Sequence, residues 1–215
     1  NPASNPQLLS ALADHFVEQH FDFKELLRTI TNSHAYGLAS TTHLGNGIDH
    51  QNYSRHYRKQ LSAEVLLQAV IDVTQIDESF TAMPAKSRPN QIWTHRVSSV
   101  FLDTFGRPDP NQDPPCERLP DANVTQALHL MNAPESMVKI RHRFGTARQL
   151  SESKQNDQEI VEELYLKTLS RYPTTEEAEA MGRVFQIEGV DRRTAVEDLL
   201  WVLLNTREFV FNHRF

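Results

Sequence analysis

The chain has 215 residues, of which 39% are hydrophobic and 23% charged, a composition typical of a folded globular protein rather than a disordered one. Its formal net charge of −6 argues against a nucleic-acid binder, and no apolar run reaches the roughly 18–20 residues that span a bilayer. Its single cysteine, Cys116, excludes an internal disulfide framework and a Cys-x-x-Cys zinc or haem motif.

The first third of the sequence predicts two helices and a long loop. Pro6 favours a helix start with Asn5 as its cap, and Asp22 can cap a second helix. Residues 33–53 show no hydrophobic period and hold three of the seven glycines, so they predict a loop. The chain starts at Asn1 instead of Met, and we expect it to be an internal or trimmed piece of a longer protein.

The middle of the sequence predicts one central helix followed by a segment with little regular structure. Residues 61–75 are apolar on nearly every side, as in a helix enclosed by a bundle. Seven of the eleven prolines fall between Pro84 and Pro120, so residues 77–122 predict a Pro-rich, mostly non-regular insertion. Within it, residues 91–105 fit either a short strand or a short helix.

The last part of the sequence is helical again. Apolar spacing predicts helices over 124–131, after Pro134 to about Phe144, and over 157–170. A capping box at 174–177 opens another helix, and a last one runs from about Arg193 to Thr206 with Asp191 as cap. The fold class is therefore all-α: a single domain over residues 1–215, built as an irregular bundle of about seven or eight helices.

The densest polar cluster lies in and after the long loop. Its members carry amide, carboxylate, imidazole and guanidinium groups: Asn46, Asp49, His50, Asn52, Arg58 and Glu64. Oxygen ligands at this spacing could bind a hard cation such as calcium, but Asn and Asp more often bond nearby backbone groups and fix turns, and we favour turns. Because Glu64 begins an otherwise apolar helix, we expect its carboxylate to be partly buried and paired with Arg58 or a loop amide.

Other charged groups carry no recognisable site. The ten histidines include no His-x-x-x-His or His-Glu-x-x-His spacing, so we expect neither a bound metal nor another cofactor. Residues 139–148 form a basic run, which we interpret as the solvated face or the C-terminal end of a helix rather than a phosphate site. Cys116 is interpreted as a structural thiol that is buried or faces a partner.

The closing helix is predicted to be a central element of the core. Its apolar residues, including Val196, Val202 and Leu203, cover most of its circumference. Asn205 and Glu208 are the polar exceptions, and we expect them to bond backbone groups at the helix end or to hold the loop at 46–52.

Several segments in order carry a family resemblance. The most specific are the Gln126-Ala127-Leu128 to Asn132 stretch and a C-terminal motif of Trp201, Asn205, Glu208 and Phe209; weaker matches include Arg171, Thr174 and Glu177. Together they resemble the planctomycete-type PSD domain of unknown function. That resemblance implies that the chain is the C-terminal part of a larger, exported multidomain bacterial protein, which often carries a cytochrome c-like domain. It also implies a periplasmic or cell-surface location, and contact with other domains of the parent protein or with polysaccharide.

Three functions remain open on this basis. The favoured one is a non-catalytic structural or interaction module, because no nucleophile, phosphate-loop or dinucleotide motif is present. A carbohydrate-directed hydrolytic enzyme would need two carboxylates at a defined separation, with Asp49, Glu64 and His50 near a cleft. The third is a ligand- or metal-binding module that uses the polar loop and helix at 46–64.

Overall fold

The computed structural model describes residues 2–49, 51–81, 83–93, 97–108 and 124–212. The chain divides into two compact units, one made of Asn1–Lys59 with Asn212–Phe215 and the other of Gln60–Phe211. We call these unit 1 and unit 2 and describe each by itself. The single domain expected over residues 1–215 stays an expectation. Cys116 and His50 lie outside the described residues.

Unit 1 begins with the two predicted helices, α1 (Pro6–Glu18) and α2 (Phe23–Thr31). Both predicted caps are confirmed: the Asn5 side-chain oxygen accepts a hydrogen bond from the Leu8 amide at 3.0 Å, and the Asp22 carboxylate accepts from the Lys24 amide at 2.8 Å. The chain turns between the helices through residues with positive φ, His20 and Phe21. The predicted loop is also confirmed, since the described residues of 33–53 form no helix or strand.

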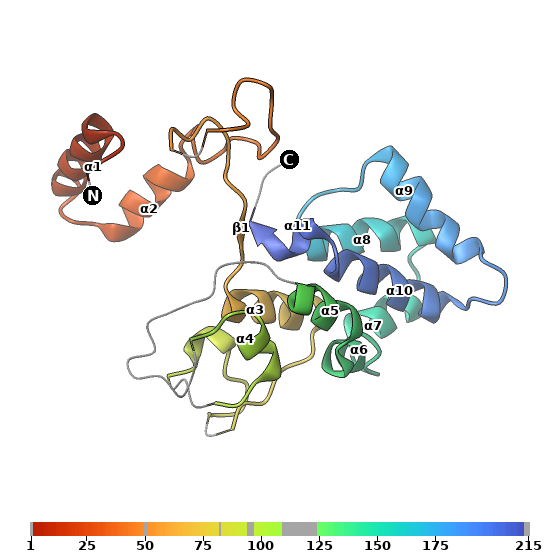
Figure 1. The fold of residues 1–215 in the computed structure, drawn as a ribbon. Coiled ribbons are helices and arrows are strands. Elements are labelled where there is room, and N and C mark those ends of the chain that lie inside the picture. Colours follow the sequence, from red (N-terminus) through yellow and green to blue (C-terminus); the bar gives the residue numbers. More distant parts are fainter. Residues whose placement is uncertain (1, 50, 82, 94–96, 109–123, 213–215) are drawn as a thin grey trace. The chain divides into compact units, whose positions relative to one another are not determined.

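The core of unit 2 is built around α3 (Ala63–Thr74), as the apolar sequence of this segment predicted. Two long helices complete it, α8 (Asp157–Leu169) and α10 (Arg192–Leu204), which lie side by side in Figure 1. The largest fully buried side chains come mainly from these three helices: Leu66, Leu67, Ile160, Val161, Leu164, Val196, Leu199, Leu200 and Leu203. Val202 of α10 is 39% exposed, so the expectation that this side of the helix is buried in the core is wrong at that position.

The Pro-rich segment is mostly non-regular where the structure describes it. It contains a 3₁₀ turn, η1 (Pro89–Gln91), and the short helix α4 (Val100–Thr104), which resolves the choice between strand and helix at 91–105 in favour of helix. α4 packs on α3 and on α5 (Val124–Asn132). Residues 109–122 of the predicted insertion lie outside the described residues.

The remaining elements of unit 2 are short. They are α6 (Pro134–Ile140), α7 (Thr146–Glu152), α9 (Thr175–Gly182), η2 (Arg183–Gln186) and α11 (Arg207–Val210). The only strands in the described chain, β1 (Lys59–Gln60) and β2 (Phe211–Asn212), form a two-stranded sheet. The all-α bundle is thus confirmed, with eleven α-helices among the described residues because α4, α7 and α11 add to the eight predicted.

The last predicted helix ends close to its expected end, and the short helix α11 follows it. α10 ends at Leu204, where the Asn205 amide group donates to the Trp201 carbonyl at 2.7 Å, and the Thr206 hydroxyl then caps α11 by accepting from the Phe209 amide at 3.2 Å. No helix in the described part of the chain combines the length and apolar character needed to cross a bilayer.

Candidate functional site

The loop that carries most of the predicted polar cluster is held by short-range hydrogen bonds. The Asn46 side-chain oxygen accepts from the His43 amide at 2.7 Å. The Asp49 carboxylate accepts four bonds from residues 51–54, among them the backbone amides of Gln51 and Asn52 at 3.0 Å each. These are Asx-type turns, the local use of Asn and Asp that we favoured over cation binding.

The same donors fix the charge of Asp49. Hydrogen bonds from the Ser54 side chain and from the amides of Gln51 and Asn52 hold the pKa of the Asp49 carboxyl well below its usual range. Asp49 is therefore ionised throughout the neutral range and is a poor general acid, which would need a raised pKa. Among the described residues, no group of three or more His, Cys, Asp or Glu side chains is arranged to hold a metal ion.

The rest of the predicted cluster is divided between the units. Arg58 belongs to unit 1, where its Nε lies 3.4 Å from the hydroxyl of the buried Ser40. Glu64 belongs to unit 2, where it is half-buried in the first turn of α3, as expected for a carboxylate at the start of an apolar helix. The pairing of Glu64 with Arg58 stays a prediction.

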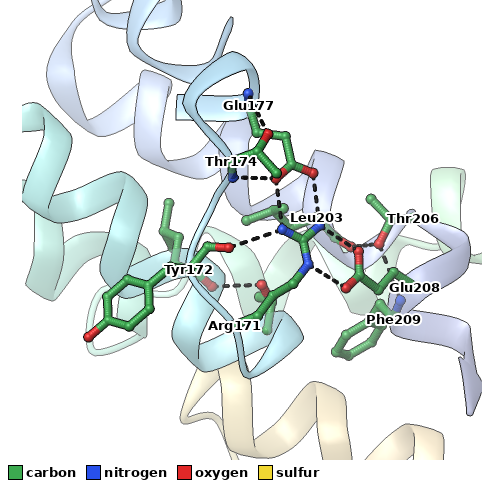
Figure 2. Close-up of polar contacts among 10 residues, drawn as sticks. Arg171, Tyr172, Thr174, Glu177, Leu203, Thr206, Glu208 and Phe209 are labelled. Atoms are coloured by element: carbon green, nitrogen blue, oxygen red, sulfur yellow. Dashed lines mark hydrogen bonds and ion pairs between the residues drawn. The ribbon is translucent and has the colours of Figure 1, made fainter. Parts of the chain in front are cut away.

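The best-built charged constellation is formed by Arg171, Glu177 and Glu208, which we call the arginine clamp (Figure 2). The Arg171 guanidinium donates to both Glu208 carboxylate oxygens at 2.7 and 2.8 Å and to both Glu177 oxygens at 2.7 and 2.8 Å. A fifth bond reaches the Tyr172 carbonyl at 3.1 Å. All five N–H groups of the guanidinium are thus engaged, and the clamp joins the end of α8 to the starts of α9 and α11.

Local sequence explains how two members of the clamp are positioned. α8 ends at Ser170 in the left-handed conformation (φ 55°), and the chain leaves the helix at Arg171. Thr174 then caps α9, and the Glu177 carboxylate accepts a hydrogen bond from the Thr174 amide at 2.8 Å, which completes the predicted capping box. The Arg171 guanidinium also lies 5.3 Å from the ring centre of the buried Tyr165.

Charge pairing sets the protonation states in the clamp. The hydrogen bonds from Arg171 lower the pKa of Glu177 to about 2, and the two carboxylates raise the pKa of Arg171 above its ordinary value. Burial raises the pKa of Tyr165. Glu177 and Arg171 are therefore both charged at neutral pH. The polar atoms of all three clamp residues are directed at one another.

The other residues of the C-terminal motif also contact the protein itself. The Trp201 indole donates to the Met131 carbonyl at 3.2 Å, and Phe209 is buried in the core. Asn205 bonds a backbone carbonyl at the end of α10, as predicted. Glu208 differs from the expectation, because it binds the side chain of Arg171, which lies 37 residues earlier. The motif is thus built into the packing of unit 2.

One residue of the basic run is not the solvated cation that the sequence suggested. Lys139 is 7% exposed, and its ammonium lies 2.9 Å from the Glu78 carboxylate, 3.2 Å from the Ile76 carbonyl and 3.4 Å from the Asp77 carbonyl. It fastens α6 to the segment that follows α3. No residue near Lys139 in the sequence indicates this role, since the partners lie more than 60 residues away.

A pocket that the sequence did not indicate lies beside Lys139. It has a volume of about 200 Å³ and is lined by residues of α3, α4, α5 and α6, including the apolar Leu67 and Phe101 and the titratable His129. His129 is one of the ten histidines, none of which has a metal-binding spacing in the sequence. Its Nε2 is buried and has no hydrogen-bond partner among the described residues.

A comparison of the sequence with models of protein families identifies the family of this chain. The model of PSD1, described as a protein of unknown function (DUF1553), matches residues 1–185. The chain belongs to the PSD1 family. No curated protein and no solved structure matches it.

The PSD1 match covers the Asn1–Lys59 part of unit 1 and residues 60–185 of unit 2, and it ends within η2. It includes Arg171 and Glu177, but Glu208, Trp201 and the rest of the C-terminal motif lie beyond its end. The arginine clamp therefore connects the matched part of the PSD1 chain to the helices that follow. PSD1 is a family of unknown function, so membership assigns no reaction.

Proposed function

We propose that this PSD1 chain is a non-catalytic interaction module of an exported, multidomain bacterial protein, and that helices α1 and α2 bind another domain of the same parent. The observation that carries the proposal is that neither helix contains a buried residue. Six large apolar side chains are 45–65% exposed on this hairpin: Leu8, Leu9, Val17, Phe21, Phe23 and Leu27. An apolar surface of this kind is typical of an interaction site.

The hairpin has only a narrow seam of its own. Half-buried Leu12, Phe16, Leu26 and Ile30 lie on the two helices, the His15 ring bonds the Thr29 hydroxyl at 3.1 Å, and the Phe16 and Phe21 rings meet edge to face. Helices of 13 and 9 residues are marginal in water without tertiary packing. A covering surface would supply the packing that the described residues of unit 1 do not.

The charged residues support a module rather than an enzyme. Arg171, Glu177 and Glu208 hydrogen-bond to one another, and the Lys139 ammonium binds oxygen atoms within unit 2. Asp49 is ionised and saturated by local donors, which gives the carbohydrate-directed alternative no general acid at that position. The periplasmic or cell-surface location and the multidomain parent rest on the family resemblance.

The test is binding of this chain to the remaining domains of its parent protein, measured by calorimetry with matched variants. Leu9→Asp places a charge on the exposed apolar face, and Ser10→Asp places the same charge on the adjacent exposed polar position. Burial of a leucine is worth about 1.5–3 kcal/mol, so we expect Leu9→Asp to weaken binding by about tenfold or more. Ser10→Asp should change it by less than about twofold.

Two results would contradict the proposal. If the chain alone forms a dimer that Leu9→Asp dissociates, the face binds a second copy. If Leu9→Asp lowers the melting temperature of the isolated chain by several degrees while Ser10→Asp does not, unit 2 of the same chain covers the face.

A further inference from the structure

The turn between α6 and α7, residues 141–145, is fixed at its base. Gly145 and Thr146 are buried there. A Cβ on Gly145 would lie 3.2 Å from the carbonyl oxygens of both Lys139 and Thr74, so any other residue would push these backbone segments apart. The Thr146 hydroxyl donates to a second carbonyl at the end of α3, at 2.6 Å. The turn is therefore held firmly against α3, and its tip is presented on a rigid backbone.

Phe144 is displayed at the tip of this turn. It is 62% exposed, and the ring contacts that the structure shows for it are with the two residues before it. The Arg143 guanidinium lies 4.5 Å from the centre of the Phe144 ring, and the centre of the His142 ring lies 5.8 Å away. Val138, on the preceding turn of α6, is exposed to the same extent. Because the backbone is already fixed, these apolar side chains can bind a partner at little cost in ordering.

Guanidinium groups surround the tip. Arg141 and Arg143 are exposed, and Arg193 of α10 reaches the same turn by donating to the Arg141 carbonyl at 3.0 Å. One carboxylate opposes them: Glu197 lies 2.7 Å from Arg193 and 3.7 Å from Arg141, and its side chain is only 12% exposed. Three cations and one carboxylate leave a local charge of +2. The single acid of α6, Glu135, lies at the opposite end of that helix.

We propose that this turn binds the surface of a membrane that contains anionic lipids. The Phe144 ring inserts among the headgroups, and Arg141, Arg143 and Arg193 lie against lipid phosphates. Apolar side chains beside clustered cations are typical of peripheral attachment to anionic membranes. An acidic peptide is the weaker candidate, because peptides are usually bound in grooves or along strand edges, whereas Phe144 projects from a turn. The site uses residues of unit 2 alone and stands apart from the function proposed for α1 and α2.

The test is sedimentation of the full chain with vesicles, made either of phosphatidylcholine alone or of phosphatidylcholine and phosphatidylglycerol in equal amounts. We expect the chain to sediment with the anionic vesicles only. Added salt should release it, because the range of the attraction falls from about 10 Å at 0.1 M to about 3 Å at 1 M ionic strength. Inorganic phosphate should release no more chain than sodium chloride of the same ionic strength, since the ligand is the lipid surface.

Matched variants separate the role of the ring from that of the charge. Phe144→Ser should weaken vesicle binding about tenfold, whereas Tyr172→Ser removes a similarly exposed ring from the turn before α9 and should leave binding unchanged. Arg143→Gln should weaken binding about fivefold, and Arg183→Gln, at an exposed position of η2, less than about twofold. All four variants replace exposed side chains, so each should melt within about 2 °C of the wild type.

Four results would overturn the proposal. The first two are an absence of binding to anionic vesicles at about 1 mM lipid, and equal binding to both kinds of vesicle. The third is vesicle binding that Phe144→Ser leaves unchanged and Leu9→Asp abolishes, which would assign the membrane contact to α1. The fourth is binding of the chain to polyglutamate and not to vesicles, which would make the turn a site for an acidic protein segment.

Discussion

Removal of the Arg171 side chain tests whether the arginine clamp holds unit 2 together. Arg171→Ala deletes all five hydrogen bonds of the guanidinium and leaves two carboxylates facing each other without their shared cation. Glu208 is the more sensitive partner, because its side chain is 14% exposed against 32% for Glu177. A largely buried carboxylate that loses its cation carries a desolvation cost that no other contact offsets.

The magnitude follows from the partial burial of the clamp. Loss of one partner from a buried ion pair costs about 3–5 kcal/mol, and from an exposed pair about 0–1 kcal/mol. Arg171 has a side chain that is 28% exposed, so we expect an intermediate loss of about 2–3 kcal/mol in the free energy of unfolding. For a chain of this size that loss corresponds to a fall of about 4–12 °C in melting temperature.

The measurement is thermal unfolding by calorimetry and near-ultraviolet circular dichroism. The matched control is Arg148→Ala, which removes the same side chain from a more exposed ion pair with Glu152 and should cost less than about 1 kcal/mol. Arg171→Lys keeps the charge but loses the planar fork, so it should fall between wild type and Arg171→Ala. If Arg171→Ala melts within about 2 °C of Arg148→Ala, the clamp is not a stabilising element and the reasoning fails.

Three further predictions concern the same unit. Acid should destabilise wild type more than Arg171→Ala between pH 4.5 and about 2. The pKa of Glu177 is lowered from its ordinary 4.5 to about 2 in the folded protein, so its stabilising contribution is present above pH 4.5 and is lost as the pH falls to 2. Urea unfolding measured across this pH range tests this. Lys139→Met should cost about 2–4 kcal/mol in a denaturant titration, and Lys167→Met, at a half-exposed pair with Glu163, less than about 1. A chain truncated after Asp191 should lack a cooperative melt, because it loses the fully buried Val196 and Leu200.

The helix ends could be predicted because their signals are local. Asn5, Asp22 and Asp191 each bond an amide two or three residues ahead, and Thr174 with Glu177 does so in both directions. Such contacts depend on residue type and spacing alone, so the sequence contains everything needed to place them. The central position of α3 could also be predicted from the sequence, because a helix that is apolar on nearly every side is typically enclosed by other elements.

The long-range contacts could not be predicted for the opposite reason. Lys139 lies in a basic run whose neighbours carry the same charge, and nothing near it in sequence indicates that it binds residues 76–78. The pocket at His129 likewise depends on how α3, α4, α5 and α6 meet, and a lone histidine among apolar residues gives no sign of that. The polar loop was conspicuous in sequence, yet the bonds of Asp49 reach only residues 51–54.

The arginine clamp lies between these two cases and shows what a charged motif can mean in a PSD1 chain. Arg171, Glu177 and Glu208 were all part of the family resemblance, and a charged residue in a family motif is commonly taken as a sign of binding or catalysis. Here the three bond one another, with the guanidinium saturated and Glu208 mostly buried. Their arrangement joins α8, α9 and α11, so the motif specifies how the helices meet.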